Sequence, residues 1–372
     1  MVVLSFVAIA VSAVVVTSSG SAALRHGRSA KDSVLQQAKA FVASSTGIET
    51  KWDGPTSGPK AVSGKKIVVI SCDQTNQVCK AWAAAVQRAA NVLGWKSSVI
   101  DGRGTPTGWQ SALQSAIALH PNGIVLAGVD ATAEHQIISQ GKSQGITFVG
   151  MHVAALPGPK PALDVFMNIQ QFPSEIAKLQ IDEVIANSQA KANVVLYYDS
   201  EYAIAVAKDK AYRADLSKCH TCRLVSNVNF PIAKLSTDTP SLISSWVSRF
   251  PKPFYVVSVG DSVFDYMPAA LQAGGVSKSD VMLVGADGTP PAYQRIRQGN
   301  FQIATVPEPA DFEGWMAVDE LNRAFAHGKP AVFSPPVYLV TKADINKEGG
   351  SHDVFNPSNN YVQHYKKIWG VK

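Results

Sequence analysis

The sequence predicts an α/β protein made of two doubly wound, Rossmann-like lobes joined by a hinge. Short apolar runs such as KIVVIS (66–71) and VMLVGAD (281–287) have the unbroken hydrophobicity of strands buried on both faces. Helical stretches of about 10–15 residues separate such runs roughly ten times, which is typical of parallel βαβ units. The 372 residues suggest two domains. Because a closed barrel would need only about eight units, two open sheets are favoured.

The elements are expected in a regular order from residue 66. Apolar side chains at helical spacing predict the first helices, as with Trp82, Val86 and Ala89, or Trp109 and Leu113. Later helices are expected over 240–250 and 311–327. The expected strands are KIVVIS (66–71), SSVID (97–101), NGIVLAG (122–128), ITFVGMH (146–152), DVFMNI (164–169), NVVLYYD (193–199), RLVSNVNF (223–230), FYVVSVG (254–260), VMLVGAD (281–287), FQIATV (301–306) and VYLVT (337–341).

The N-terminal residues predict export. Residues 1–16 are uncharged and apolar, and small residues follow up to Ala23, so 1–23 resemble a signal peptide. No Lys or Arg precedes the apolar run, which leaves open whether the segment is cleaved or kept as an anchor. Residues 24–65 are expected to form a short helix and a linker rich in Pro, Gly and Ser. With no cysteine near the cleavage region, we expect a periplasmic or extracellular protein without a lipid anchor.

Composition excludes several classes of protein. A mean hydropathy of +0.03 excludes a polytopic membrane protein, and 46% apolar residues exclude disorder. Lys and Arg number 34 against 28 Asp and Glu, but the excess is scattered, so no nucleic-acid partner is expected. We expect a monomer without cofactor or metal.

Four cysteines form two local pairs, Cys72 with Cys79 and Cys219 with Cys222. An even count in an exported chain favours two disulfides. Cys219-His220-Thr221-Cys222 is also a CxxC motif, which could be a redox site or half of a zinc site. No second motif completes a zinc site, and this CxxC follows a helical stretch where a redox motif should begin a helix. A structural role is therefore favoured.

Polar side chains gather at the expected strand ends, where open α/β sheets bind their ligands. These ends include Asp130, Asp199, Asp261, Asp287 and Glu308. Carboxylates can accept hydrogen bonds from ligand hydroxyl or amino groups. Aromatic residues lie near these strand ends and could cover an apolar face of the ligand: Tyr202, Phe172 and Trp109. A GxSxG match at 141–145 leads into a strand and not into a helix, so we reject a nucleophile elbow.

The segment VMLVGADGTPPAYQRIRQGNFQIATVPEPADFEGWMAVDEL (281–321) resembles the type I periplasmic sugar-binding proteins, the ribose-binding-like receptors of ABC importers. Support comes from NVLGWKSSVIDG (91–102), HPNGIVLAGVDAT (120–132) and KSQGITFVGMH (142–152). The resemblance implies two lobes linked by three crossings, a non-enzymatic receptor that closes over its ligand, and delivery to an ABC permease. Lobe 1 would hold 66–166 with 308–339, and lobe 2 would hold 167–307 with 340–372.

The resemblance also implies binding residues. Asp287 matches the ligand-binding Asp of the family, and Glu308 falls where a binding Gln is common near the hinge. Others in matching positions are Asp261, Asn76, Thr132 and His152. Val78 and Cys79 stand where the family often has two aromatic residues that stack on the ligand. We therefore expect a sugar or polyol, but not specifically a pyranose ring held between two aromatic side chains.

Two alternatives stay open at this point. The same fold could serve as the sensor module of a chemoreceptor or histidine kinase. Less in keeping with the sequence, the chain could be an exported thiol–disulfide enzyme that uses Cys219 and Cys222.

Overall fold

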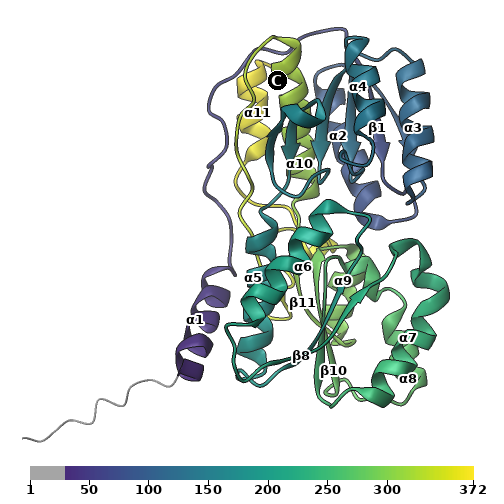
Figure 1. Ribbon diagram of the computed structural model, residues 1–372. Coiled ribbons are helices and arrows are strands. Elements are labelled where there is room, and N and C mark those ends of the chain that lie inside the picture. Colours follow the sequence, from purple (N-terminus) through teal and green to yellow (C-terminus); the bar gives the residue numbers. More distant parts are fainter. Residues whose placement is uncertain (1–29) are drawn as a thin grey trace, which may run out of the picture.

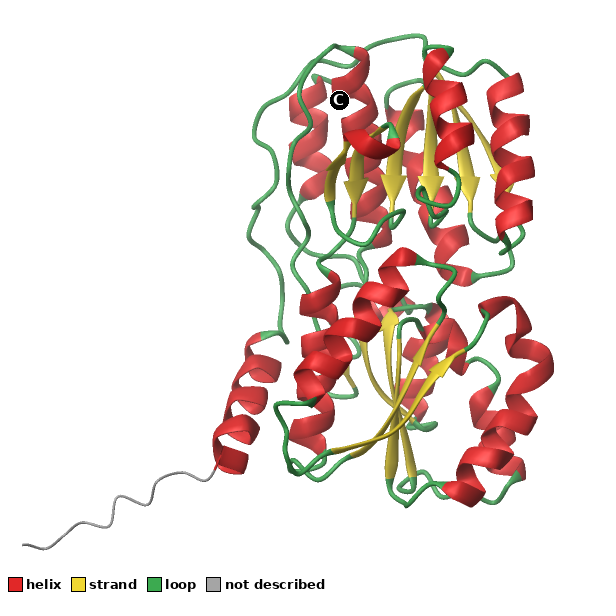
Figure 2. Cartoon of the chain, in the orientation of Figure 1, coloured by secondary structure: helices red, strands yellow, loops and turns green. Residues whose placement is uncertain are grey.

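A computed structural model describes residues 30–372 and shows two α/β lobes, one above the other in the view of Figures 1 and 2. Each lobe is built around a six-stranded sheet. The predicted fold class is confirmed, because both sheets are parallel apart from one antiparallel edge strand each. No helix among the described residues combines the length and apolar composition needed to span a bilayer.

Lobe 1 contains the first sheet, in the order β2-β1-β3-β4-β6-β5. Its central strands are mostly apolar and buried, as predicted for strands covered on both faces. The strands are β1 (Lys66–Ser71), β2 (Lys96–Asp101), β3 (Gly123–Ala127), β4 (Thr147–Met151), β5 (Gly158–Lys160) and β6 (Val165–Ile169). The helices packed in this lobe are α2 (Gln77–Val92), α3 (Pro106–Ala118), α4 (His135–Ser143), α10 (Ala310–Phe325) and α11 (Tyr361–Trp369).

Lobe 2 contains the second sheet, in the order β12-β11-β10-β9-β7-β8. Two apolar clusters cover its two faces. The strands are β7 (Asn193–Tyr198), β8 (Arg223–Asn229), β9 (Phe254–Ser258), β10 (Val281–Asp287), β11 (Gln302–Pro307) and β12 (Val340–Thr341). The helices are α1 (Ala30–Ser44), α5 (Pro173–Asn187), α6 (Ala203–Leu216), α7 (Leu235–Arg249), α8 (Met267–Ala273) and α9 (Pro290–Gln298).

The division of the chain between the lobes differs from expectation at two places. The first crossing comes after Ile169 and not after residue 166, because β6 pairs with β4 in lobe 1. The tail is shared: β12 pairs with β11 in lobe 2, whereas α11 buries Tyr365 and Trp369 in the core of lobe 1. Placing all of 340–372 in lobe 2 was therefore wrong, because the aromatic face of α11 stacks on Trp315 of α10.

The N-terminal part of the described chain also joins the two lobes. Helix α1 packs on α5 of lobe 2, and residues 45–65 then run along the outside of both lobes to β1 (Figure 1). The stretch is fixed by side-chain contacts on the way, with Trp52 stacked on His364 at 4.4 Å and Asn322 Oδ1 accepting from the Val62 amide. Besides residues 45–65, the chain passes between the lobes at 170–172, 308–309, 326–339 and 356–360. The signal-like segment 1–23 lies outside the described residues.

Candidate functional site

A cavity of about 80 Å³ lies where the carboxyl ends of the two sheets face each other. That is the position at which parallel α/β sheets bind ligands. Side chains from both lobes and from the hinge enclose it, so no single lobe forms the site. The lining residues are Cys72, Asn76, Val78, Cys79, Trp82, Gly128, His152, Tyr202, Ile204, Ala205, Lys208, Ile232, Val259, Gly260, Ser262, Asp287 and Glu308.

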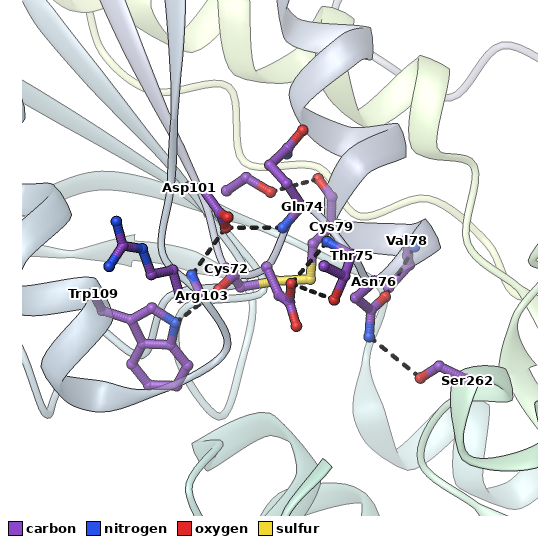
Figure 3. Close-up of a disulfide and its surroundings, with 12 residues drawn as sticks. Cys72, Gln74, Thr75, Asn76, Val78, Cys79, Asp101, Arg103, Trp109 and Ser262 are labelled. Carbon is purple, nitrogen blue, oxygen red and sulfur yellow. Dashed lines mark hydrogen bonds between the residues drawn. A yellow bond between two sulfur atoms is a disulfide. The ribbon is translucent and has the colours of Figure 1, made fainter. Parts of the chain in front are cut away.

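The lobe 1 wall is held in place by a disulfide. Cys72 and Cys79 are bonded, with Cα atoms 5.7 Å apart, and they bracket the loop between β1 and α2 (Figure 3). In this loop Asn76 caps α2 by accepting from the Val78 amide at 3.0 Å. Gly128 sits against the bridge in a positive-φ conformation, where a side chain would collide with Cys72 Sγ. The cross-link and the cap together fix a loop that would otherwise be mobile.

Behind this wall, Trp82 and His152 stack with their ring centres 4.3 Å apart. Both rings point at Glu313 on the first turn of α10: Trp82 Nε1 donates at 3.0 Å and His152 Nε2 at 3.1 Å. His152 has a φ of 57°, a left-handed conformation that costs energy in a residue with a side chain. The strain is offset by the hydrogen bond to Glu313.

The lobe 2 wall carries the charged side chains Lys208 and Asp287. Lys208 Nζ donates to the Val259 carbonyl at 3.1 Å and to Glu308 Oε1 at 3.3 Å, and the lysine is only 3% exposed. Asp287 ends β10 with a φ of 87°, a second strained conformation at the cavity. Tyr202, at the start of α6, presents its ring beside them and packs edge-on against Trp109 of lobe 1.

The buried charges form one network. Glu308 Oε1 pairs with Lys208, and His152 Nε2 lies 3.4 Å from Glu308 Oε2 and 3.1 Å from Glu313. Burial by itself would lower the pKa of His152, but the charges of Glu308 and Glu313 outweigh it and raise that pKa. Burial, reinforced by the charge of Glu308, raises the pKa of Asp287 well above its usual value.

The lobes touch each other around the cavity. Asn76 Nδ2 donates to Ser262 Oγ at 3.3 Å across the gap (Figure 3). Asp130 of lobe 1 accepts from the amides of Thr132 and Ala133 through one oxygen, and its other oxygen accepts from the Ala203 amide of lobe 2 at 2.7 Å. Asp130 thus caps its own turn and the first turn of α6 in the other lobe. These contacts are those of a closed arrangement.

Five of the predicted site residues line the cavity: Asn76, His152, Tyr202, Asp287 and Glu308. The other three do not. The carboxylate of Asp261 is buried beside it and accepts from the Gly288 amide, Thr305 Oγ1 and Gln302 Nε2, so it holds the loop of Asp287 in shape.

Thr132 is exposed, and its amide takes part in the Asp130 turn. Phe172 is 41% exposed at the start of α5, on a connection between the lobes. Neither residue lines the cavity.

Sequence reasoning missed Lys208 and Glu313 and assigned Trp82 to packing alone. Lys208 lies inside α6 and Glu313 inside α10, where charged residues ordinarily face solvent. One signal was available for Glu313: in the segment 310–321 it stands among apolar residues that bury the face of α10.

The trio His152, Glu308 and Glu313 offers ligand atoms within 4.8 Å of one another, a spacing that a metal ion could bridge. These groups are already paired, however, and the Lys208 ammonium occupies the neighbourhood of Glu308. A divalent cation that took all three groups as ligands would have to break these pairs. The donor set fits an internal ion-pair network better than a metal centre.

The second disulfide lies at the opposite edge of its sheet. Cys219 and Cys222 are bonded, with Cα atoms 5.3 Å apart, in the turn between α6 and the amino end of β8. Both predicted pairs are thus confirmed. Cys219 is 3% exposed, and Thr221 in the same turn donates its hydroxyl to the Ala190 carbonyl, which ties the turn to lobe 2.

Comparison with known proteins identifies the family of the fold. The family model of the periplasmic binding protein domain matches residues 67–330. No curated protein matches the sequence. Three solved structures share the fold at 15–18% identity. A sugar ABC transporter protein from Yersinia enterocolitica (15% identity) has a TM-score of 0.70, covering 83% of this chain and 96% of its own.

The other two structures carry bound ligands in their descriptions. The myo-inositol binding protein of Caulobacter, bound to myo-inositol, has a TM-score of 0.67 at 18% identity, covering 79% of this chain and 99% of its own. The arabinose ABC transporter component of Shewanella sp. ANA-3, bound to L-arabinofuranose, has a TM-score of 0.64 at 15% identity, covering 82% and 95%. At such identities the likeness establishes the fold. Because the family model matches most of this chain, residues 67–330, the chain belongs to the periplasmic binding protein family.

Proposed function

We propose that this protein is an exported receptor that captures a small polar molecule, a sugar or polyol in the first instance, and delivers it to an ABC permease. The observation that carries the proposal is the cavity itself, because polar side chains from both lobes and from the hinge line one small space. Asn76 and His152 come from lobe 1, Lys208 and Asp287 from lobe 2, and Glu308 from the connection between them.

Such a site couples binding to closure. Only the closed arrangement brings both walls into contact with one ligand, so the ligand shifts the equilibrium toward closure by its differential affinity. The connections at 170–172 and 308–309 can act as the hinge, since few residues lie between the last element of one lobe and the first of the next. The closed form would then present a surface from both lobes to the permease.

The structural relatives support the ligand class. The Caulobacter protein is described with bound myo-inositol and the Shewanella protein with bound arabinofuranose, which are both compact and rich in hydroxyl groups. Hydroxyl groups are matched here by acceptors on Asp287, Glu308 and the side-chain oxygen of Asn76. The uncharged N-terminal run and the two disulfides support export.

A sensor role remains the second candidate function, since closure on a ligand could signal to a receptor instead of a permease. The enzyme alternative is less favoured, because Cys219 and Cys222 lie at the sheet edge opposite the cavity. An insulin-reduction assay with Cys222→Ser as the control tests it directly.

The proposal is tested by thermal shift of the purified protein against a panel of sugars, polyols and amino compounds. A ligand that binds the folded state raises the melting temperature by mass action. We expect at least one compact hydroxylated compound to do so, and we expect Asn76→Ala and Lys208→Met, on opposite walls, each to reduce the shift. A flat response across the panel would argue against a solute receptor.

A further inference from the structure

The network of buried charged groups around the cavity holds more carboxyl groups than cationic groups. Among the described residues, Asp287 and Glu308 line the cavity and Glu313 lies behind its lobe 1 wall, whereas the cationic groups are Lys208 and His152, which both line the cavity. Glu308 pairs with Lys208, and Glu313 pairs with His152. Asp287 is left over: it lines the cavity, and none of the hydrogen bonds found in residues 30–372 ends on its carboxylate. One carboxyl group in the site thus has no hydrogen-bonding partner among the described residues.

A second carboxyl oxygen at the cavity, Oε2 of Glu308, also lacks a hydrogen-bond donor. Glu308 is 3% exposed and lines the same cavity, and its Oε2 accepts no hydrogen bond from any described residue. His152 Nε2 lies 3.4 Å from this oxygen, but it donates to Glu313. Leaving a buried carboxylate oxygen without a donor costs free energy, so such an atom is expected where a ligand supplies the missing donor. Asp287 also has a strained, positive φ of 87° at its position beside the cavity.

The remaining surfaces suit the carbon frame of a small molecule. Trp82 and Tyr202 present aromatic surface, and Val78, Ile204 and Ile232 present aliphatic surface to the same space. Aromatic faces attract a nearby cation as well as covering apolar groups. The volume of about 80 Å³ restricts the closed cavity to a compact ligand.

We propose that the ligand carries a primary ammonium group beside its hydroxyl groups, and that Asp287 and Glu308 Oε2 receive this ammonium. The inference rests on the proposed function, because it specifies the class of solute that the receptor captures. An ammonium offers three donors and one positive charge. The donors match the carboxyl oxygens that lack a hydrogen bond, and the charge would hold Asp287 in its ionised form. A hydroxyl in the same place offers a single neutral donor. Amino sugars and amino polyols are the chemical class that combines both features.

Matched pairs of compounds test the inference by calorimetry on the full-length protein: glucose against glucosamine, galactose against galactosamine, and glycerol against 3-amino-1,2-propanediol. We expect at least one amine to bind about tenfold or more tightly than its hydroxyl counterpart, as charge-assisted hydrogen bonds are stronger than neutral ones. We expect Asp287→Asn to bring the two affinities within about threefold, because the amide lacks the charge. Glu175→Gln, an exposed carboxylate on α5, serves as the matched control and should leave the ratio unchanged.

The outcomes separate the inference from the function on which it rests. A neutral sugar or polyol that binds as tightly as its amine, or an amine preference that survives Asp287→Asn, would overturn the inference and leave the receptor function standing. Binding of Zn²⁺ or Mn²⁺ alone in competition with the amine would also overturn it, since the carboxylates would then be metal ligands. If neither member of any pair bound, and the wider panel gave no thermal shift, the receptor function itself would fall.

Discussion

The two walls of the cavity are built differently although the two lobes share an architecture. The lobe 1 wall is a cross-linked loop with an aromatic stack, in which His152 is the titratable side chain. The lobe 2 wall bears Lys208 and Asp287, with Glu308 of the hinge beside them. The lobe 1 wall is therefore shaped by covalent and packing constraints, and the lobe 2 wall by paired and unpaired charged groups. Substitutions on the two sides should therefore fail in different ways.

The largest effect is expected at Glu313, the carboxylate behind the lobe 1 wall. Glu313→Ala removes the acceptor for Trp82 Nε1 and leaves His152 buried without this partner. We expect the free energy of unfolding in urea to fall by about 3–5 kcal/mol. Glu313→Gln keeps an oxygen for the indole and should lose less. An alanine variant within about 0.5 kcal/mol of the parent would show that the stack does not depend on this charge.

A pH series extends the comparison to the cores of the two lobes. Burial raises the pKa of Glu320, on α10 of lobe 1, to about 8, and that of Glu183, on α5 of lobe 2, to about 7. A raised pKa means that the folded state holds the proton more tightly, so the contribution to stability is complete at low pH and is lost as the pH rises through the folded pKa.

We therefore expect the free energy of unfolding to fall from about pH 5, just above the ordinary pKa of a glutamate, to about pH 8, the folded pKa of Glu320. Glu320→Gln should remove about 2–4 kcal/mol of that fall, because the amide has no proton to lose. Glu183→Gln should act at lower pH, in keeping with its lower pKa. Equal stability of the parent at both ends of the range would contradict these assignments.

The two disulfides offer a matched pair for separating stability from binding. Both close short loops, with sequence separations of 7 and 3. We expect Cys72→Ser with Cys79→Ser, and Cys219→Ser with Cys222→Ser, each to cost about 2 kcal/mol of unfolding free energy. Only the first pair should also weaken ligand binding, because it frees the loop that holds Asn76. Equal binding losses in both double variants would mean that the cleft disulfide has no local role.

The smallest effect is expected at Asp130, which touches both lobes without lining the cavity. Asp130→Ala removes the cap of its own turn and the bond to the Ala203 amide. We expect a loss of about 1 kcal/mol in stability and a weaker ligand affinity with a faster dissociation rate, measured by stopped-flow fluorescence. Unchanged dissociation would show that the contact between the lobes does not hold the closed form.

Much of this architecture could be predicted from the sequence, because buried parallel strands leave a strong local signal. Runs such as VMLVGAD mark both the strand and the polar residue at its end, and topology brings those ends together. Asp287 and Glu308 were found in this way.

The remainder depends on packing that periodicity does not encode. Lys208 and Glu313 enter the site from helices, and only the three-dimensional arrangement turns them away from solvent. Thr132 and Phe172 illustrate the opposite error, since proximity to a strand end in sequence does not fix the direction of a side chain. The lobe assignment of α11 failed for the same reason: a stack of aromatic rings with α10 decides it.

Small-angle X-ray scattering with and without the most stabilising compound of the panel tests the central claim most directly. If the solute sits between the walls, the free protein should have a larger radius of gyration than the bound one, and the bound profile should match the closed arrangement described here. A compound that raises the melting temperature while both profiles coincide with an open form would contradict capture between the lobes.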